Sequence, residues 1–232
     1  MSGLKPQGAG GSASAPGALT GSERRPGSSL SPKPKIAVAV SGQGRSLLNF
    51  LSGDYPFAVG AVICSNPKAL ALDIAREHGL PVYVDDFRSV DADALNRWLT
   101  EDSIALIALA GFLKPFPALA DYRNRVINIH PSLLPQYGGH GMYGKRVHEA
   151  VISAQEAFTG ATVHFVNERY DEGSIIAQAR IATTGILTAE ELAHQVFQLE
   201  CALYPEVLTR LLKRELPLSE GRIWHFEKGS PC

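Results

Sequence analysis

Short apolar runs alternate with segments of helical periodicity along the first half of the chain. The run 36–40 is followed by a predicted helix at 46–51, and the same order repeats after the run 57–64. Further strands are predicted at 82–84, 104–110 and 126–129, and further helices at 68–78, closed by Gly79, and at 91–99. Strands that alternate with helices pair in parallel through right-handed crossovers. The pattern therefore predicts an α/β fold with a Rossmann-like, mostly parallel sheet and helices on both faces.

The hydrophobic pattern changes after residue 130. Two alternating segments, 161–166 and 174–181, flank a polar turn at 167–173 and predict an antiparallel extension of the sheet in the C-terminal half. Residues 188–191, Thr-Ala-Glu-Glu, have the spacing of a capping box. They begin a long helix whose apolar stripe is Leu192, Val196, Leu199 and Leu203. Pro205 has no backbone N–H, so we expect it to kink or split this helix.

The first 34 residues differ in composition from the rest of the chain. Gly, Ser, Ala and Pro dominate there, and large apolar side chains are rare, so the segment cannot offset its ordering entropy by burial. We predict a disordered N-terminal arm over 1–34 and a single domain over 35–232. Arg24, Arg25 and the serines also suit an organelle transit peptide. The amphipathic pattern is poor, however, and a plain tail is the preferred interpretation.

The charge balance and the cysteines narrow the classes of partner. The 232 residues carry a formal net charge of −1, which argues against a nucleic-acid scaffold or a membrane-surface protein. No apolar run reaches the roughly 18 residues that span a bilayer. Cys64, Cys201 and Cys232 lie far apart and form no C-x-x-C pair, which indicates reduced thiols. We expect a cytoplasmic protein, a monomer or homodimer, that binds small molecules and neither nucleic acid nor membrane.

Asn128 and His130 form the strongest candidate site. If 126–130 is a strand, both side chains project from one face, while Ile127 and Ile129 enter the other. Pro131 ends the strand, which places the pair at the carboxyl end, where open α/β sheets bind ligands. An amide can donate to a developing oxyanion and an imidazole can move a proton, so the pair suits acyl transfer. The alternative is that Asn128 caps a turn and His130 is a satisfied interior histidine.

The loop Ser41-Gly-Gln-Gly-Arg-Ser46 follows the first predicted strand and precedes a helix. It lacks the G-K-[S/T] of a Walker A loop, and the third glycine of a dinucleotide fingerprint is replaced by Leu47. Its backbone N–H groups and the helix N-terminus favour a single phosphate, to which Arg45 can add a charged fork. The alternative is a tight turn that needs small residues.

Four histidines have spacings that match no standard zinc pattern: His130, His140, His148 and His164. We therefore predict no metal. His164 lies within the strand predicted at 161–166. It either faces the Asn128–His130 pair as an auxiliary residue or is an ordinary half-buried strand residue.

Four sequence blocks carry a resemblance to a known family. They are VINIHPSLLPQYGG from Val126, GATVHFVNERYDEGSIIAQARI from Gly160, AGFLKPF at 110–116 and QLECALYPEV at 198–207. In this order and spacing they resemble the glycinamide ribonucleotide formyltransferases, from about residue 35 to residue 224. The run N-I-H-P-S-L-L-P with H-F-V and a D-x-G turn is specific to formyltransferases that use 10-formyltetrahydrofolate. The segment HGMYGKRVHEAV favours purine-pathway members over those acting on methionyl-tRNA or sugars.

The resemblance implies a role for each matched residue. Asn128, His130 and Asp171 match a catalytic trio in which Asn128 and protonated His130 stabilise the tetrahedral oxyanion and Asp171 orients the imidazole. The co-substrate is 10-formyltetrahydrofolate, and no metal takes part. The match assigns binding of the ribonucleotide to Gly42, Gly44, Arg45, Ser46, Pro131 and Glu200, the last as the acid that holds the ribose hydroxyls. It assigns binding of the folate to Gly111, Leu113, Lys114, Val166, Asn167, Glu168 and Tyr170.

One departure from the family and three other functions stay open at this point. The family's phosphate loop reads S-G-N-G-S-N, whereas this chain has Gln43, Arg45 and Ser46 at the differing positions. A deformylase of the same folate shares the trio but carries an additional N-terminal domain. A formyltransferase for another amine, such as an amino sugar, needs no ribose phosphate site. A non-catalytic nucleotide- or folate-binding module has no need of amide, imidazole and carboxylate together.

Overall fold

The computed structural model describes residues 32–186, 188–216 and 223–226. All but the last three residues of the predicted arm, 1–34, lie outside this range, as does Cys232. Cys64 and Cys201 are free thiols.

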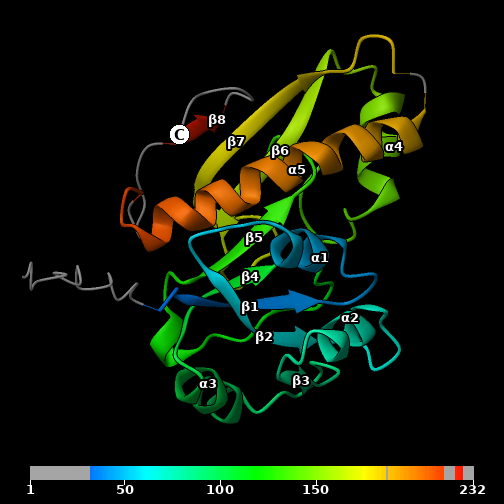
Figure 1. The fold of residues 1–232 in the computed structure, drawn as a ribbon. Helices are drawn as coiled ribbons and strands as arrows, with labels where there is room; N and C mark the ends of the chain where they lie inside the picture. Colours follow the sequence, from blue (N-terminus) through cyan, green and yellow to red (C-terminus); the bar gives the residue numbers. More distant parts are fainter. Residues whose placement is uncertain (1–31, 187, 217–222, 227–232) are drawn as a thin grey trace, which may run out of the picture. The chain divides into compact units, whose positions relative to one another are not determined.

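One eight-stranded sheet runs through the described residues, in the order β3-β2-β1-β4-β5-β6-β7-β8 (Figure 1). Neighbouring strands from β3 to β5 are parallel, β6 is antiparallel to both β5 and β7, and β8 is parallel to β7. The strands are β1 Lys35–Val40, β2 Ala58–Cys64, β3 Val82–Val84, β4 Ile104–Leu109, β5 Val126–His130, β6 Phe158–Phe165, β7 Ile175–Ala182 and β8 Trp224–Phe226. The predicted fold class, a mostly parallel sheet with an antiparallel extension, is confirmed.

Helices cover both faces of this sheet. They are α1 Arg45–Ser52, α2 Ala71–Glu77, α3 Ala92–Glu101, the 3-10 turn η1 Ala120–Tyr122, α4 Lys145–Ser153 and α5 Ala189–Leu212. Successive residues of β1 alternate between two cores: Ile36 packs in the core that contains α1, α2 and α5, and Ala37 packs in the core that contains α3. Figure 1 shows α1 and α5 side by side over the sheet. The predicted capping box of α5 and the left-handed conformation of Gly79 (φ 62°) are confirmed.

Of the two effects expected of Pro205, a kink or a split, the split is wrong, because α5 continues through this residue from Ala189 to Leu212. A proline leaves the carbonyl four residues earlier without its helical N–H donor. That carbonyl belongs to Cys201, and it accepts a hydrogen bond from Nδ2 of Asn49 on α1, at 3.1 Å. A side chain of the neighbouring helix therefore supplies the donor that the proline removes.

Three elements were not predicted from the sequence, and the shortest helical one is η1 at Ala120–Tyr122. The helix α4 begins after Gly144, whose position offers no capping side chain, so no start signal precedes it. The strand β8 spans only Trp224–Phe226, which is too short for a periodic pattern.

A buried tyrosine ties α5 to the strands that lead to the candidate site. The hydroxyl of Tyr204 lies 3.1 Å from the carbonyl oxygen of Leu109 and 2.9 Å from that of Ile127. Leu109 is the last residue of β4, and Ile127 is the second residue of β5. These hydrogen bonds fix the position of α5 relative to the sheet. Glu200 lies one helical turn before Tyr204 and lines the cavity described below.

Candidate active site

A cavity of about 850 Å³ opens at the carboxyl ends of β1, β4 and β5. Its walls come from the segments that follow these strands, residues 42–46, 109–116 and 128–131, and from parts of the loops at 139–144 and 166–171. The edge of α5 completes it. Open α/β sheets bind ligands at this edge because successive crossovers diverge there and leave a crevice.

Asn128 and His164 face each other across the β5–β6 pair. They are directly opposite in the antiparallel register, and Nδ2 of Asn128 lies 3.0 Å from Nε2 of His164. Nδ1 of His164 donates to the carbonyl oxygen of Phe165 at 2.8 Å, so in the neutral ring Nε2 is an acceptor and Asn128 donates to it. His164 therefore faces the site and fixes the orientation of the Asn128 amide. It is not an isolated strand residue.

Both ring nitrogens of His130 face acceptors. Nε2 donates to the carbonyl oxygen of Tyr137 at 2.8 Å, and Nδ1 lies 3.3 Å from Oδ2 of Asp171. Burial nevertheless lowers the pKa of His130 below its usual value, with a further contribution from the charge of His164, and Asp171 and the carbonyl offset this only in part. The free protein consequently favours a neutral His130 with its proton on Nε2 and its Nδ1 lone pair beside the carboxylate.

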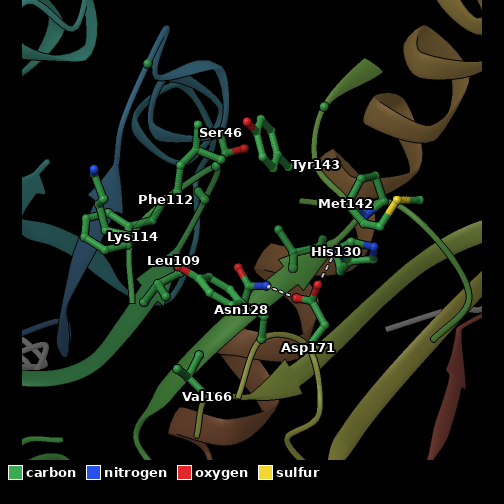
Figure 2. Close-up of a pocket in the computed structure, with 18 of the residues that line it drawn as sticks. Ser46, Leu109, Phe112, Lys114, Asn128, His130, Met142, Tyr143, Val166 and Asp171 are labelled. Carbon is green, nitrogen blue, oxygen red and sulfur yellow. Dashed lines mark hydrogen bonds and ion pairs between the residues drawn. The ribbon is translucent and has the colours of Figure 1, made fainter. Parts of the chain in front are cut away.

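Asp171 contacts both the Asn128–His164 pair and His130. Its backbone is left-handed (φ 59°), a conformation that aspartate tolerates in turns. Oδ2 accepts a hydrogen bond from the N–H of Gly139 at 2.9 Å, and Oδ1 accepts one from Nδ2 of Asn128 at 3.4 Å. Burial on its own raises the pKa of Asp171, but the contacts with His164, His130 and Gly139 outweigh it and hold the pKa below its usual value. Figure 2 shows the Asp171 carboxylate between Asn128 and His130.

The loop after β1 has the geometry of an anion site. Gly44 has φ 72°, and a Cβ built there would lie 2.8 Å from the Cβ of Ala71, so the loop requires glycine at this position. Gly44 makes no side-chain cap, and no acidic residue occurs in the first turn of α1. The N–H groups of that turn are therefore available to a ligand. Gly42, Gly44, Arg45 and Ser46 all line the cavity.

Arg45 and Glu200 place opposite formal charges at this end of the cavity. The guanidinium of Arg45 lies 4.0 Å from the ring centroid of Phe197 on α5. Burial raises the pKa of Glu200 to about 8, and the charge of Arg45 opposes this only weakly. Glu200 is thus mostly protonated at neutral pH, so it can both donate and accept hydrogen bonds. This differs from the solvated helix face that Glu200 alone would suggest.

The residues that the sequence assigns to folate binding line the same cavity as Asn128. All seven line the cavity, on the loop after β4 and the loop after β6: Gly111, Leu113, Lys114, Val166, Asn167, Glu168 and Tyr170. The hydroxyl of Ser41 accepts the N–H of Leu113 at 2.8 Å, which ties the loop after β4 to the loop after β1. Figure 2 shows Lys114 and Phe112 on one side of Asn128 and Met142 on the other.

Several residues that line or support the cavity were missed by the sequence prediction. The backbone groups of Tyr137 and Gly139 hold His130 and Asp171, and no side-chain pattern reveals a contact made by backbone atoms. Met142 and Tyr143 line the cavity from a loop with positive φ at Gly139, Gly141 and Gly144. The cluster of glycines at 138–144 is the signal that marks this loop.

The described part of the chain has neither a membrane-spanning helix nor a cluster of metal ligands. No helix within it is both long enough and apolar enough to cross a bilayer. Within the described residues, no group of three or more His, Cys, Asp and Glu side chains is arranged so that it could hold a metal ion.

Comparison with known proteins agrees with this geometry. Residues 34–208 match the formyl transferase family. The chain belongs to this family. It is 34% identical to phosphoribosylglycinamide formyltransferase, chloroplastic, from Arabidopsis thaliana over 85% of this chain and 72% of that protein. Identity to phosphoribosylglycinamide formyltransferase from Haemophilus influenzae is 32%, over 85% of this chain and 96% of the relative. The crystal structure of glycinamide ribonucleotide transformylase 1 from Symbiobacterium toebii superposes with a TM-score of 0.71 at 32% identity, covering 82% and 92% of the two chains.

Membership of the formyl transferase family gives the site a reaction class. Transfer of a formyl group passes through a tetrahedral intermediate with a negatively charged oxygen, and such sites place hydrogen-bond donors and a proton carrier around it. The amide, imidazole and carboxylate side chains that converge here are of the kinds that this chemistry uses.

Proposed function

We propose that this protein transfers the formyl group of 10-formyltetrahydrofolate to the amine of glycinamide ribonucleotide. One observation carries the proposal: Asn128, His130 and Asp171 contact one another in a cavity whose two parts differ in chemistry. One half has a loop suited to a phosphate, and the other has the apolar walls that a pterin requires. A single site is thus suited to an anionic amine substrate and a folate at the same time.

The half formed by the loop after β1 suits the ribonucleotide. Backbone N–H groups at the start of α1 and the charge of Arg45 bind the phosphate, in place of the serine and asparagine of the usual family loop. The protonated Glu200 bonds the ribose hydroxyls, since it offers both a donor and acceptors. Pro131 lines the cavity next to the reacting groups.

The loop after β4 and the loop after β6 suit the folate. Phe112 and Phe116 are packed edge to face, with ring centroids 5.7 Å apart, and line the cavity. The backbone of 111–114 and 166–170 offers peptide groups that can hydrogen-bond the edge of a pterin ring. This arrangement brings the formyl group to Asn128, which lines the same cavity.

Proton movement in the reaction can be followed atom by atom. The amine nitrogen attacks the formyl carbon, and the carbonyl oxygen becomes an oxyanion. Nδ2 of Asn128 donates a hydrogen bond to that oxygen. In doing so it loses its 3.4 Å contact with Oδ1 of Asp171. Neutral His130 takes a proton released by the amine at Nδ1, where Asp171 stabilises the imidazolium. The bond from the carbon to the folate nitrogen then breaks, and that nitrogen takes the proton.

Product analysis tests the function directly. The purified protein is incubated with 10-formyltetrahydrofolate alone, with glycinamide ribonucleotide added, and with an amino sugar added instead. Formylated glycinamide ribonucleotide is expected, with little formate in the first reaction. Formate released without any amine would indicate a deformylase, and a formylated sugar would indicate a different acceptor. No product in any reaction would indicate a binding module.

The remaining expectations about the protein's setting stay predictions. A monomer or homodimer that binds small molecules is still the expected state. The cytoplasmic location is likewise a prediction, and the Arabidopsis thaliana relative is named as chloroplastic. Fractionation of cells and size-exclusion chromatography with light scattering address these two points.

A further inference from the structure

His148 lacks the partners that the other two buried histidines of the cavity have. It lies on α4, it is only 5% exposed, and it lines the cavity. Its Nδ1 is buried and has no hydrogen-bond partner among the described residues. His130 and His164, in contrast, each have both ring nitrogens in polar contact. A buried polar group without a partner is costly, and Nδ1 can gain a partner if the ring turns it toward a molecule bound in the cavity.

The charge state of His148 limits what that molecule can present. Burial, with smaller contributions from His130 and Arg45, lowers the pKa of His148 to about 4. The ring is therefore neutral at neutral pH and offers one N–H donor and one lone pair. A phosphate is better served by the Arg45 guanidinium. A neutral imidazole suits an uncharged amide or hydroxyl, which it reaches through Nε2, or through Nδ1 after rotation of the ring.

The position of His148 selects the amide. In the proposed function the phosphate occupies residues 42–46, the ribose hydroxyls meet Glu200, and the amine meets Asn128 and His130. The polar group of glycinamide ribonucleotide that remains is the amide between the ribose and the amine. His148 lines the same cavity as His130 at the reacting end and Arg45 at the phosphate end. The amide of the bound substrate lies between the same two ends.

We propose that His148 is a substrate-binding residue that hydrogen-bonds the glycinamide amide. This assignment rests on the proposed function, since it takes its substrate from there. It makes His148 a determinant of specificity for an amide-linked amine, because the residue recognises neither the phosphate nor the ribose.

Binding measurements with two probes test the proposal. Affinities for glycinamide ribonucleotide and for ribose 5-phosphate, which lacks the amide, are measured by calorimetry for the wild type, His148→Leu and His148→Gln. Loss of a neutral hydrogen bond is expected to weaken binding of glycinamide ribonucleotide to His148→Leu by roughly 2- to 13-fold. Binding of ribose 5-phosphate is expected to be unchanged. His148→Gln keeps a donor and an acceptor and is expected to lose less. The KM for 10-formyltetrahydrofolate is expected to be unchanged in both variants.

A matched control and a stability measurement separate binding from folding. His194 is an exposed histidine on α5 that does not line the cavity, so His194→Leu is expected to bind both probes as the wild type does. Without ligand, His148→Leu is expected to melt at or above the wild-type temperature, because it removes an unpaired buried group. If that variant fails to fold, His148→Gln carries the comparison.

Two results would overturn the assignment. Equal affinity of the wild type and His148→Leu for glycinamide ribonucleotide would mean that only water meets the imidazole. Equal weakening for both probes would place the contact at the ribose phosphate or reveal a disturbed site. If the wild type instead bound ribose 5-phosphate and glycinamide ribonucleotide with equal affinity, the proposed function would be overturned. The role of His148 would fall with it.

Discussion

Asp171 shows how one side chain can control the charge of another. Its carboxylate contacts Nδ1 of His130 at 3.3 Å and raises the pKa of that histidine against the larger effect of burial. A neutral His130 accepts a proton only if a negative charge stabilises the resulting imidazolium. At the scale of the residue, the charge of His130 depends on its pairing with Asp171 as well as on its burial.

Removing the charge of Asp171 should therefore change the pH dependence of the reaction. In Asp171→Asn the shape of the side chain is kept, and the pKa of His130 is expected to fall further, because the charge that raised it is lost. The limb of the kcat profile that reports His130 should move to lower pH, and kcat at neutral pH should fall by roughly 10²- to 10⁴-fold. Glu172→Gln, on the exposed neighbour, is the control. An unchanged profile in Asp171→Asn would limit Asp171 to a turn residue.

Arg45 is the residue at which the phosphate loop departs most from its family. A cation at the first position of a helix is opposed by the helix dipole, so its presence there needs a compensating interaction, and a phosphate supplies one. Arg45→Ala is expected to raise the KM for glycinamide ribonucleotide by roughly 10- to 150-fold, which corresponds to a charged hydrogen bond of about 1.5–3 kcal/mol. The KM for the folate and the saturating kcat should change little, since the phosphate is remote from the reacting carbon.

Steady-state kinetics with each substrate varied separately measure this effect. Arg76→Ala, which removes an exposed arginine paired with Asp73 on α2, serves as the control. Equal increases in both KM values would point to a disturbed fold. No increase in either would mean that the backbone N–H groups bind the phosphate without Arg45.

At the scale of the element, α5 depends on its neighbour α1. Pro205 leaves the carbonyl of Cys201 without a helical donor, and Asn49 of α1 supplies one. The stability of α5 around Glu200 therefore includes a contact between two helices, in addition to its own ladder and capping box.

Asn49→Ala is expected to lower the free energy of unfolding by about 1–3 kcal/mol, because the Cys201 carbonyl loses its donor. In the Pro205→Ala background the backbone N–H of residue 205 is restored, and the same substitution should cost much less. Urea unfolding of the four proteins in this double-mutant cycle measures the difference. Equal costs in both backgrounds would show that Asn49 acts through packing and does not replace the missing donor.

At the scale of the whole molecule, the buried groups of the cavity make folding stability depend on pH. The pKa of Glu200 is about 8 in the folded protein against an ordinary value of 4.5, so the folded state holds more protons between these values. Stability from Glu200 is therefore fully present below about pH 4.5 and is lost as the pH rises toward 8. The pKa of His148, about 4, lies below its usual value. This residue therefore lowers the free energy of unfolding as the pH falls toward 4.

Comparison with Glu200→Gln isolates the contribution of this one carboxyl. The unfolding free energy of the wild type minus that of the variant should fall between about pH 4.5 and pH 8, by at most about 1.4 kcal/mol per pH unit. The difference should be flat outside that window. Urea unfolding at a series of pH values without substrate gives this quantity. A difference that stays constant across the window would mean that Glu200 is ionised and solvated in the folded protein.

The local pattern of the sequence determined most of the fold. Strands such as 82–84, the capping box at Thr188 and the strand end at Pro131 depend on side-chain alternation and on residues with special backbone chemistry, and these signals are local. The blocks around Asn128 and His164 carried the family resemblance. The order of the elements then placed Asn128 and His130 at the carboxyl end of the sheet.

Only the tertiary structure decided the charges and partners within the site. The pairing of Asn128 with His164, the neutral state of Glu200 and the isolation of His148 depend on burial and on groups far away in the sequence. The sequence could not decide whether Pro205 would kink or split the last helix, because the donor that replaces the missing N–H, Asn49, comes from another helix. Sequence patterns record the period of burial along one element, whereas pKa values and hydrogen-bond partners are set by neighbours that folding brings together.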